Sequence, residues 1–124
     1  MKKVMIIEDN IDIQEIYKHS FLKAGYEVII EDNGFDGINQ VAEKMPDVIL
    51  LDLMMPKMDG FQFLKLMKSN PLLDIPVVVC SNISDNEVNM RVMEAGAAAV
   101  ILKVDYSGKQ LVEKVNHILE DLGK

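Results

Sequence analysis

Acidic side chains end two of the most apolar runs in this sequence. Asp52 follows the aliphatic run 48–51, and the pair Glu8-Asp9 follows a similar run at 4–7. An aliphatic run without polar alternation is typical of a strand that is covered on both faces, as in parallel α/β sheets. Ligands of such sheets bind beyond the carboxyl ends of the strands. We therefore expect Glu8, Asp9 and Asp52 to meet in one acidic, metal-binding pocket.

Such a cluster needs positive charge, because carboxylates ~4 to 5 Å apart repel by roughly 3 to 4 kcal/mol per pair at an effective dielectric near 20. Hard oxygen ligands suit Mg²⁺. Lys103, which ends the last strand-like run, adds a cation that can meet a phosphoryl oxygen or, in its absence, Asp52. Ser81, after another apolar run, offers a hydroxyl donor at the same edge. Because no catalytic cysteine or Ser/His/Asp arrangement is plausible here, Asp52 is the candidate nucleophile, one that would form an aspartyl phosphate.

The rest of the chain predicts the framework for these residues. Strand-like runs alternate with segments of helical period, which is typical of repeated βα units and a parallel sheet with five strands and five helices. The strands are expected at about 3–8, 26–31, 47–52, 76–81 and 98–103. The expected helix caps are Asn10, Asn33, Asp59, Ser84 and Ser107, with capping-box spacing from Ser84 to Glu87 and from Ser107 to Gln110. Two helices should stop at Gly25 and Gly96.

Composition limits the possible functions. The 124 residues predict a single domain, 1–124, and the net charge of −7 argues against direct binding of nucleic acid. One cysteine and two distant histidines make a zinc or thiol-redox site improbable. No stretch approaches the roughly 20 apolar residues of a membrane span, so we expect a soluble, cytoplasmic protein with no membrane partner.

Taken together, the motifs resemble the receiver domains of two-component response regulators, the family that includes the bacterial chemotaxis response regulator. The resemblance covers about residues 3–122. It rests on Glu8-Asp9, on Asp52 followed by Leu53-Met54-Met55-Pro56 and Asp59-Gly60, on Ser81, on Gly96-Ala97 and on Lys103. It implies a doubly wound (βα)5 flavodoxin-like fold, a three-layer sandwich with a five-stranded parallel sheet in the order 2-1-3-4-5.

The resemblance also implies a function. Asp9, Asp52 and the backbone carbonyl of Met54 would ligate Mg²⁺, and Glu8 would act through water. Asp52 would accept a phosphoryl group from a phosphohistidine on a sensor histidine kinase or a histidine phosphotransfer protein. Lys103 would neutralise charge on the phosphoryl oxygens, and Ser81 would move to bind one of them. This would reshape the surface of the fourth helix, fifth strand and fifth helix for a downstream protein target. Such a receiver catalyses only its own phosphorylation and dephosphorylation and is otherwise not an enzyme.

Three positions depart from the family pattern. Val100 replaces the usual Tyr or Phe, Val104 replaces the proline after the lysine, and Asn82 replaces a small alanine. We predict a smaller surface change without the ring, and a trans Lys103–Val104 bond unless the site stabilises a cis one, which costs ~3 to 4 kcal/mol at a non-proline residue. The departures encourage the main alternative, a receiver-fold interaction module that does not use phosphate. Against it, every group needed for metal and phosphoryl chemistry is present.

Three methionines closely follow the candidate phosphoacceptor in the sequence. Met54 and Ile83 would flank the path of attacking water in the family arrangement, and apolar side chains cannot orient water, so we hypothesise slow self-dephosphorylation. Met54, Met55 and Met58 form either a pliable partner-binding lip or ordinary loop packing.

Two other functions fit the sequence less well. A phosphatase acting on small substrates would need an acidic residue where Met54 stands. A flavin-binding module would need a phosphate-binding loop after the first strand, and Glu8-Asp9 has the wrong charge for a phosphate.

Overall fold

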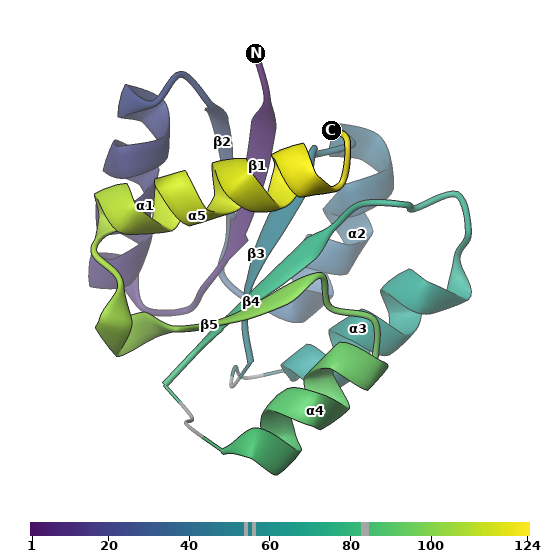
Figure 1. The fold of residues 1–124 in the computed structure, drawn as a ribbon. Coiled ribbons are helices and arrows are strands. Elements are labelled where there is room, and N and C mark those ends of the chain that lie inside the picture. Colours follow the sequence, from purple (N-terminus) through teal and green to yellow (C-terminus); the bar gives the residue numbers. More distant parts are fainter. Residues whose placement is uncertain (54, 56, 83–84) are drawn as a thin grey trace.

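The protein folds around one five-stranded parallel sheet, as a computed structural model shows for residues 1–53, 55, 57–82 and 85–124 (Figure 1). The strand order is β2-β1-β3-β4-β5, so the predicted flavodoxin-like topology is confirmed. The strands are β1 (Lys3–Ile7), β2 (Glu27–Glu31), β3 (Val48–Asp52), β4 (Val77–Ser81) and β5 (Ala99–Leu102). Each lies within one residue of its predicted bounds, because each coincides with a bounded aliphatic run.

Helices cover both faces of the sheet and complete three layers. One face packs against α1 (Ile11–Lys23) and α5 (Gly108–Asp121), and the other against α2 (Gly34–Lys44), α3 (Gly60–Ser69) and α4 (Asn86–Glu94) (Figure 1). The two cores are built from opposite faces of the same strands, since successive side chains of a strand alternate in direction. A short 3₁₀ helix, Lys103–Asp105, follows β5 and was not predicted.

Most helix ends follow the predicted capping residues. Asn10, Asn33, Asp59 and Ser107 each accept a hydrogen bond from a backbone N–H of the first helical turn, and Ser107 forms the predicted capping box with Gln110. Gly25 and Gly96 follow α1 and α4 with φ of +91° and +111°, a conformation that glycine adopts without strain.

The cap of α4 differs from the expectation. Asp85 is the N-cap, and its carboxylate accepts hydrogen bonds from the backbone N–H groups of Glu87 and Val88. The predicted cap, Ser84, lies outside the described residues. A serine and an aspartate adjacent in sequence offer the same kind of acceptor, and spacing alone did not separate them.

Because side chains alternate in direction along a strand, Glu8, Asp52 and Lys103 point to the same side of the sheet. Ile6, Leu50 and Ile101 all pack in the core on the α1 and α5 side. Two residues further along the chain from each of these lie Glu8, Asp52 and Lys103, which are therefore directed to the same side beyond the strand ends. The ladder between β1 and β2 extends to Glu8, whose N–H donates to the carbonyl of Glu31 at 3.1 Å.

No helix among the described residues has both the length and the apolar character that crossing a membrane requires.

Candidate functional site

The three predicted carboxylates meet at the carboxyl edge of the sheet. One carboxylate oxygen from each of Glu8, Asp9 and Asp52 lies within 4.8 Å of the others. Glu8 is 2% exposed, Asp52 is half-buried and Asp9 is exposed, so the cluster runs from the interior to the surface. Within the described part of the chain, this is the one group of three or more acidic, histidine or cysteine side chains that could hold a metal ion.

Lys103 crosses from β5 to neutralise this cluster. Its Nζ lies 2.6 Å from Glu8 Oε1, to which it donates a hydrogen bond, and 3.3 Å from Asp52 Oδ1. Burial by itself disfavours the ammonium, but the hydrogen bond to Glu8 and the charges of Asp52 and Glu8 outweigh it, and the pKa of Lys103 is raised. The sequence predicted the contact with Asp52, whereas the shorter contact with Glu8 is a finding of the structure.

A second set of contacts fixes Glu8. Its Oε2 accepts a hydrogen bond from the N–H of Asn10 at 3.2 Å, and its backbone carbonyl accepts one from the side-chain amide of Gln14. The same amide nitrogen of Gln14 donates to Asp32 Oδ1 at 2.9 Å. The sequence reasoning missed Gln14, although a glutamine on the buried side of α1, in line with Tyr17 and Phe21, was a usable signal.

Ser81 ends the fourth strand at the same edge of the sheet, and Asn82 follows it. Ser81 is 2% exposed, and its backbone lies in register with Leu102 of β5. It stands one residue beyond Cys80, which packs in the α1 and α5 core, so its side chain is directed to the opposite face. Asn82 is exposed. Met54 and Ile83, two other residues of the predicted site, lie outside the described residues.

A close contact of the backbone positions the segment that follows Asp52. The N–H of Gly60 donates to the carbonyl of Leu53 at 2.9 Å. A Cβ on Gly60 would come within 2.9 Å of the Cα of Leu53, so only glycine allows the start of α3 to approach here. Asp59 and Gln62 form a reciprocal capping box at the same helix end. Met55 and Met58 are partly buried against the α2, α3 and α4 core, which favours loop packing for these two methionines.

The two valines that depart from the family pattern lie in different environments. Val100 is half-buried and packs on the α2, α3 and α4 core. Val104 is 77% exposed, and the Lys103–Val104 bond is trans, as predicted. The valine therefore leaves the position of Lys103 at the carboxylates intact.

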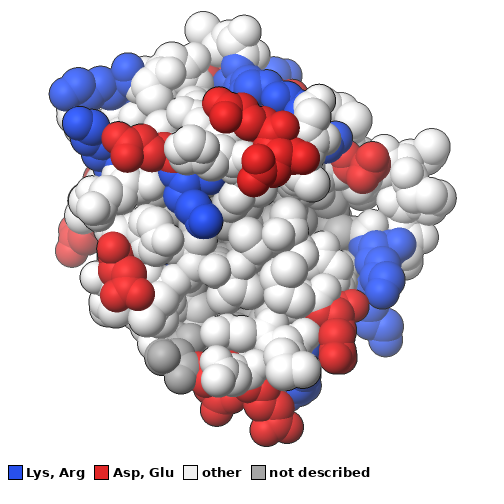
Figure 2. All heavy atoms as spheres, viewed as in Figure 1, with Lys and Arg blue, Asp and Glu red and all other residues white. Residues whose placement is uncertain are grey.

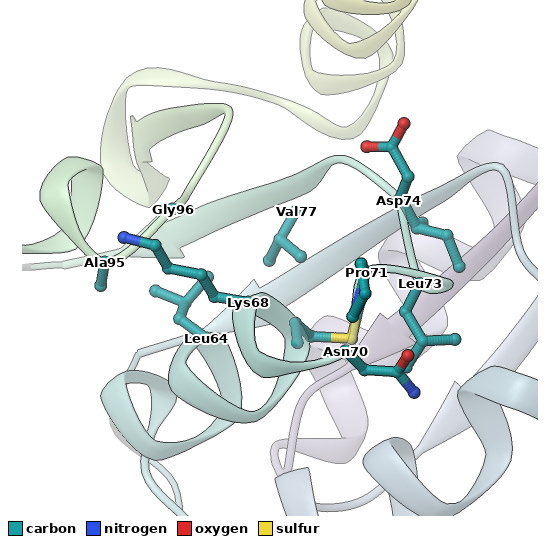
Figure 3. A pocket seen from close by; sticks show the side chains of 11 residues that line it. Leu64, Lys68, Asn70, Pro71, Leu73, Asp74, Val77, Ala95 and Gly96 are labelled. Atoms are coloured by element: carbon teal, nitrogen blue, oxygen red, sulfur yellow. The ribbon is translucent and has the colours of Figure 1, made fainter.

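Two other features of the protein do not belong to the cluster of carboxylates and Lys103. Cys80 is fully buried, and burial raises the pKa of its thiol to about 12, which makes it unreactive at neutral pH. A hollow of about 310 Å³ lies between α3 and the segments that flank β4 and α4 (Figure 3). Val77 at the start of β4 and Gly96 before β5 line it, so it lies at the opposite end of the sheet from the carboxylates.

The donor set fits a hard divalent cation. Three carboxylates supply oxygen atoms only, and no sulfur or imidazole ligand accompanies them in the described cluster. Oxygen-only donors suit Mg²⁺ better than zinc or copper. An open, doubly wound sheet that carries such a cluster and a lysine at its carboxyl edge defines a class of α/β proteins suited to binding metal and phosphoryl groups.

Comparison with known proteins identifies the family within this class. The family model of the response regulator receiver domain matches residues 4–116, and the chain belongs to that family, the receiver domains of two-component signalling systems. Among curated relatives, the chain is 36% identical over 94% of its length to "Protein-glutamate methylesterase/protein-glutamine glutaminase 2" of Chromobacterium violaceum, of which it covers 33%. It is 32% identical over 95% of its length to the phosphate regulon transcriptional regulatory protein PhoB of Klebsiella pneumoniae, of which it covers 52%.

Solved structures agree with this assignment. The Vibrio cholerae chemotaxis protein CheY4 superposes with a TM-score of 0.89 at 26% identity, over 96% of this chain and 99% of that one. A receiver domain of a histidine kinase from Syntrophus aciditrophicus gives a TM-score of 0.87 at 30% identity, over 98% and 92%. The chain spans only about a third to a half of the length of the first curated relatives.

Proposed function

We propose that this receiver domain accepts a phosphoryl group on Asp52, in a Mg²⁺-dependent reaction, from a phosphohistidine of a sensor histidine kinase or a histidine phosphotransfer protein. The observation that carries the proposal is the position of Lys103, whose Nζ lies 2.6 Å from Glu8 and 3.3 Å from Asp52. Family membership supplies the kind of partner, because receiver domains act with histidine kinases and downstream effectors.

The reaction needs little from the protein beyond position and charge. An oxygen of the Asp52 carboxylate attacks phosphorus, an O–P bond forms, and the N–P bond to the partner's imidazole breaks. The electron pair of that bond returns to the imidazole nitrogen. Lys103 can neutralise the negative charge that is transferred to Asp52 with the phosphoryl group. It already contacts Asp52, and it can turn one of its three N–H donors to a phosphoryl oxygen.

Asp9, Asp52 and the backbone carbonyl of Met54 are the proposed ligands of Mg²⁺, with Glu8 acting through water. Asp9 is the exposed member of the acidic cluster and the one most open to a hydrated ion. When bound, the ion neutralises charge on the phosphoryl oxygens in a loose transition state. The Met54 carbonyl enters the proposal from the family resemblance, because that residue lies outside the described ones.

The proposed output surface is formed by α4, β5 and α5. A phosphoryl group adds nearly two negative charges at Asp52, and Ser81, buried at the end of β4, is the hydroxyl that would bind one of its oxygens. Figure 2 shows a broad uncharged area over β5, between α5 and α4. On α4, Met90 is 64% exposed and Met93 46% exposed, which suits an apolar contact with a downstream protein. Because Val100 carries no ring, the change on this surface should be smaller than a ring would produce.

We further propose that residues 1–124 form a single receiver domain that works in the cytoplasm through protein contacts, without direct binding of nucleic acid or membrane. The net charge of −7 supports the absence of direct binding to nucleic acid or membrane, because binding to either polyanionic surface requires clustered basic residues.

Intact-mass measurement tests the proposal. After incubation with acetyl phosphate and Mg²⁺, the protein should gain about 80 Da, the mass of one phosphoryl group. The gain should disappear in Asp52→Asn and when Mg²⁺ is chelated. Asp47→Asn is a matched control, since Asp47 is an exposed aspartate just before the same strand. Absence of any adduct in the wild-type protein would contradict the proposal and favour the phosphorylation-independent interaction module.

A further inference from the structure

Tyr17 lies directly beneath the carboxylate cluster. It belongs to α1, is 8% exposed, and packs in the core that α1 and α5 share. The same core contains Ile6 and Leu50, the residues that precede Glu8 and Asp52 in their rows of the sheet. The tyrosine is therefore the next layer below the reacting group.

A small, partly open cavity lies between this tyrosine and the site. Tyr17 lines it together with Glu8, Asp52 and Cys80, and the aliphatic residues Ile6, Ile7, Leu50 and Leu51 complete the wall. The cavity has no room for a water molecule. The space between Tyr17 and the carboxylates thus excludes water, and Tyr17 is one of the residues that line this dry floor.

The phenol also lies within electrostatic reach of the site. Burial raises the pKa of Tyr17 well above its usual value, and the charges of Cys80, Glu8 and Asp52 raise it further. The tyrosine therefore stays neutral and adds no negative charge to an already crowded acidic site. Electrostatic interactions are stronger where water is excluded, so a dry floor strengthens the contacts of Lys103 above it.

We propose that Tyr17 is a positioning residue for the reaction at Asp52, because its ring closes the dry floor that holds Asp52 and Glu8 at the rim, in reach of Lys103. The inference rests on the proposed function and assigns a part in it to a residue outside the motifs of the family resemblance. The ring acts through Asp52 and Glu8 and touches neither the metal nor the phosphoryl group.

The rate of phosphorylation by acetyl phosphate and Mg²⁺ tests this role. Tyr17→Phe keeps the ring and should stay within about twofold of wild type, whereas Tyr17→Leu opens the floor and should slow adduct formation about tenfold, as small misplacements of a reacting group do. Phe21→Leu is the matched control: Phe21 is fully buried one turn further along α1 in the same core, but does not line the cavity. Equal slowing in Phe21→Leu and Tyr17→Leu, with both variants folded by circular dichroism, would overturn the proposal.

Tyrosine fluorescence gives a second measurement on the folded protein. The chain has three tyrosines and no tryptophan, so tyrosine emission is visible directly. Adding Mg²⁺ alone should change the emission of wild type, Tyr26→Phe and Tyr106→Phe, but not of Tyr17→Phe. An unchanged signal in wild type, or a full response in Tyr17→Phe, would refute the placement of Tyr17.

The two proposals fail in different ways. If wild type forms the adduct but Tyr17→Leu reacts at the wild-type rate, the positioning role is wrong and the phosphoacceptor function stands. If wild type forms no adduct, the proposed function is contradicted. The response of tyrosine emission to Mg²⁺ alone then still tests whether Tyr17 lies next to the acidic cluster.

Discussion

Replacing Lys103 with methionine should lower the stability of the protein strongly at neutral pH. The substitution keeps much of the side-chain volume but removes the one cation that contacts both Glu8 and Asp52 among the described residues. Glu8 is 2% exposed and would remain as a buried charge next to a second carboxylate. Breaking a buried pair by removing one partner costs more than the pair contributes, because the remaining charge is left uncompensated.

The magnitude follows from the two distances. Charges 2.6 and 3.3 Å apart attract by about 6 and about 5 kcal/mol at an effective dielectric near 20. Two effects offset much of this sum: the variant no longer buries an ammonium group, and water can enter to solvate the carboxylates. We expect a net loss of about 3 to 5 kcal/mol in the free energy of unfolding, a large part of the ~5 to 15 kcal/mol typical of a domain.

Urea denaturation in a buffer free of divalent cations is the appropriate assay. Lys68→Met is the matched control, because Lys68 is exposed and donates only a long hydrogen bond of 3.4 Å to the carbonyl of Glu94; its loss should cost less than about 1 kcal/mol. The double variant Lys103→Met with Glu8→Gln should recover at least about 2 kcal/mol of the loss, since it removes one of the opposed charges.

The pH dependence has a definite sign. The pKa of Lys103 is raised above 10.5 in the folded state, so its stabilising effect is fully present below pH 10.5 and is lost as the pH rises through the folded pKa. Between neutral pH and strong alkali, the gap between wild type and Lys103→Met should narrow. A loss below about 1 kcal/mol at pH 7, or strict additivity of the Lys103 and Glu8 substitutions, would refute this electrostatic reasoning.

Three further expectations concern metal, packing and lifetime. Millimolar Mg²⁺ should stabilise the folded protein by about 1.4 kcal/mol at a tenfold excess over its dissociation constant and so raise the thermal midpoint. The rise should be smaller in Asp9→Ala, and an equal rise in both proteins would remove Asp9 from the metal site. Gly60→Ala should destabilise the fold by about 1 to 3 kcal/mol in urea and slow the modification of Asp52, because its Cβ would strike the backbone of Leu53; unaltered stability would show that this contact relaxes freely. Met54→Asn should shorten the lifetime of the phosphorylated form, measured by decay of the adduct mass, because an amide can orient water; an unaltered lifetime would reject the hypothesis of slow self-dephosphorylation.

The sequence by itself determined the fold and the members of the acidic cluster. Aliphatic runs without alternation fixed the strands, and capping side chains such as Asn10 and Asp59 marked where helices begin, because both signals are local. Carboxylates at the ends of parallel strands must meet at one edge of the sheet, so the sequence alone places Asp9 and Asp52 together.

The sequence left open what depends on distances between remote segments. Lys103 and Glu8 are 95 positions apart, and no local pattern indicates that Glu8 is the closer partner of the lysine. Gln14 and Tyr17 read as parts of an ordinary amphipathic helix, and only the packing of α1 on the sheet brings them to Glu8 and Asp52. The cap of α4 was also left open by the sequence, because two adjacent residues offered equivalent acceptors, and the structure shows Asp85 in that role. Local propensity specifies which elements form, whereas the contacts that tune a charged site are set by how those elements pack.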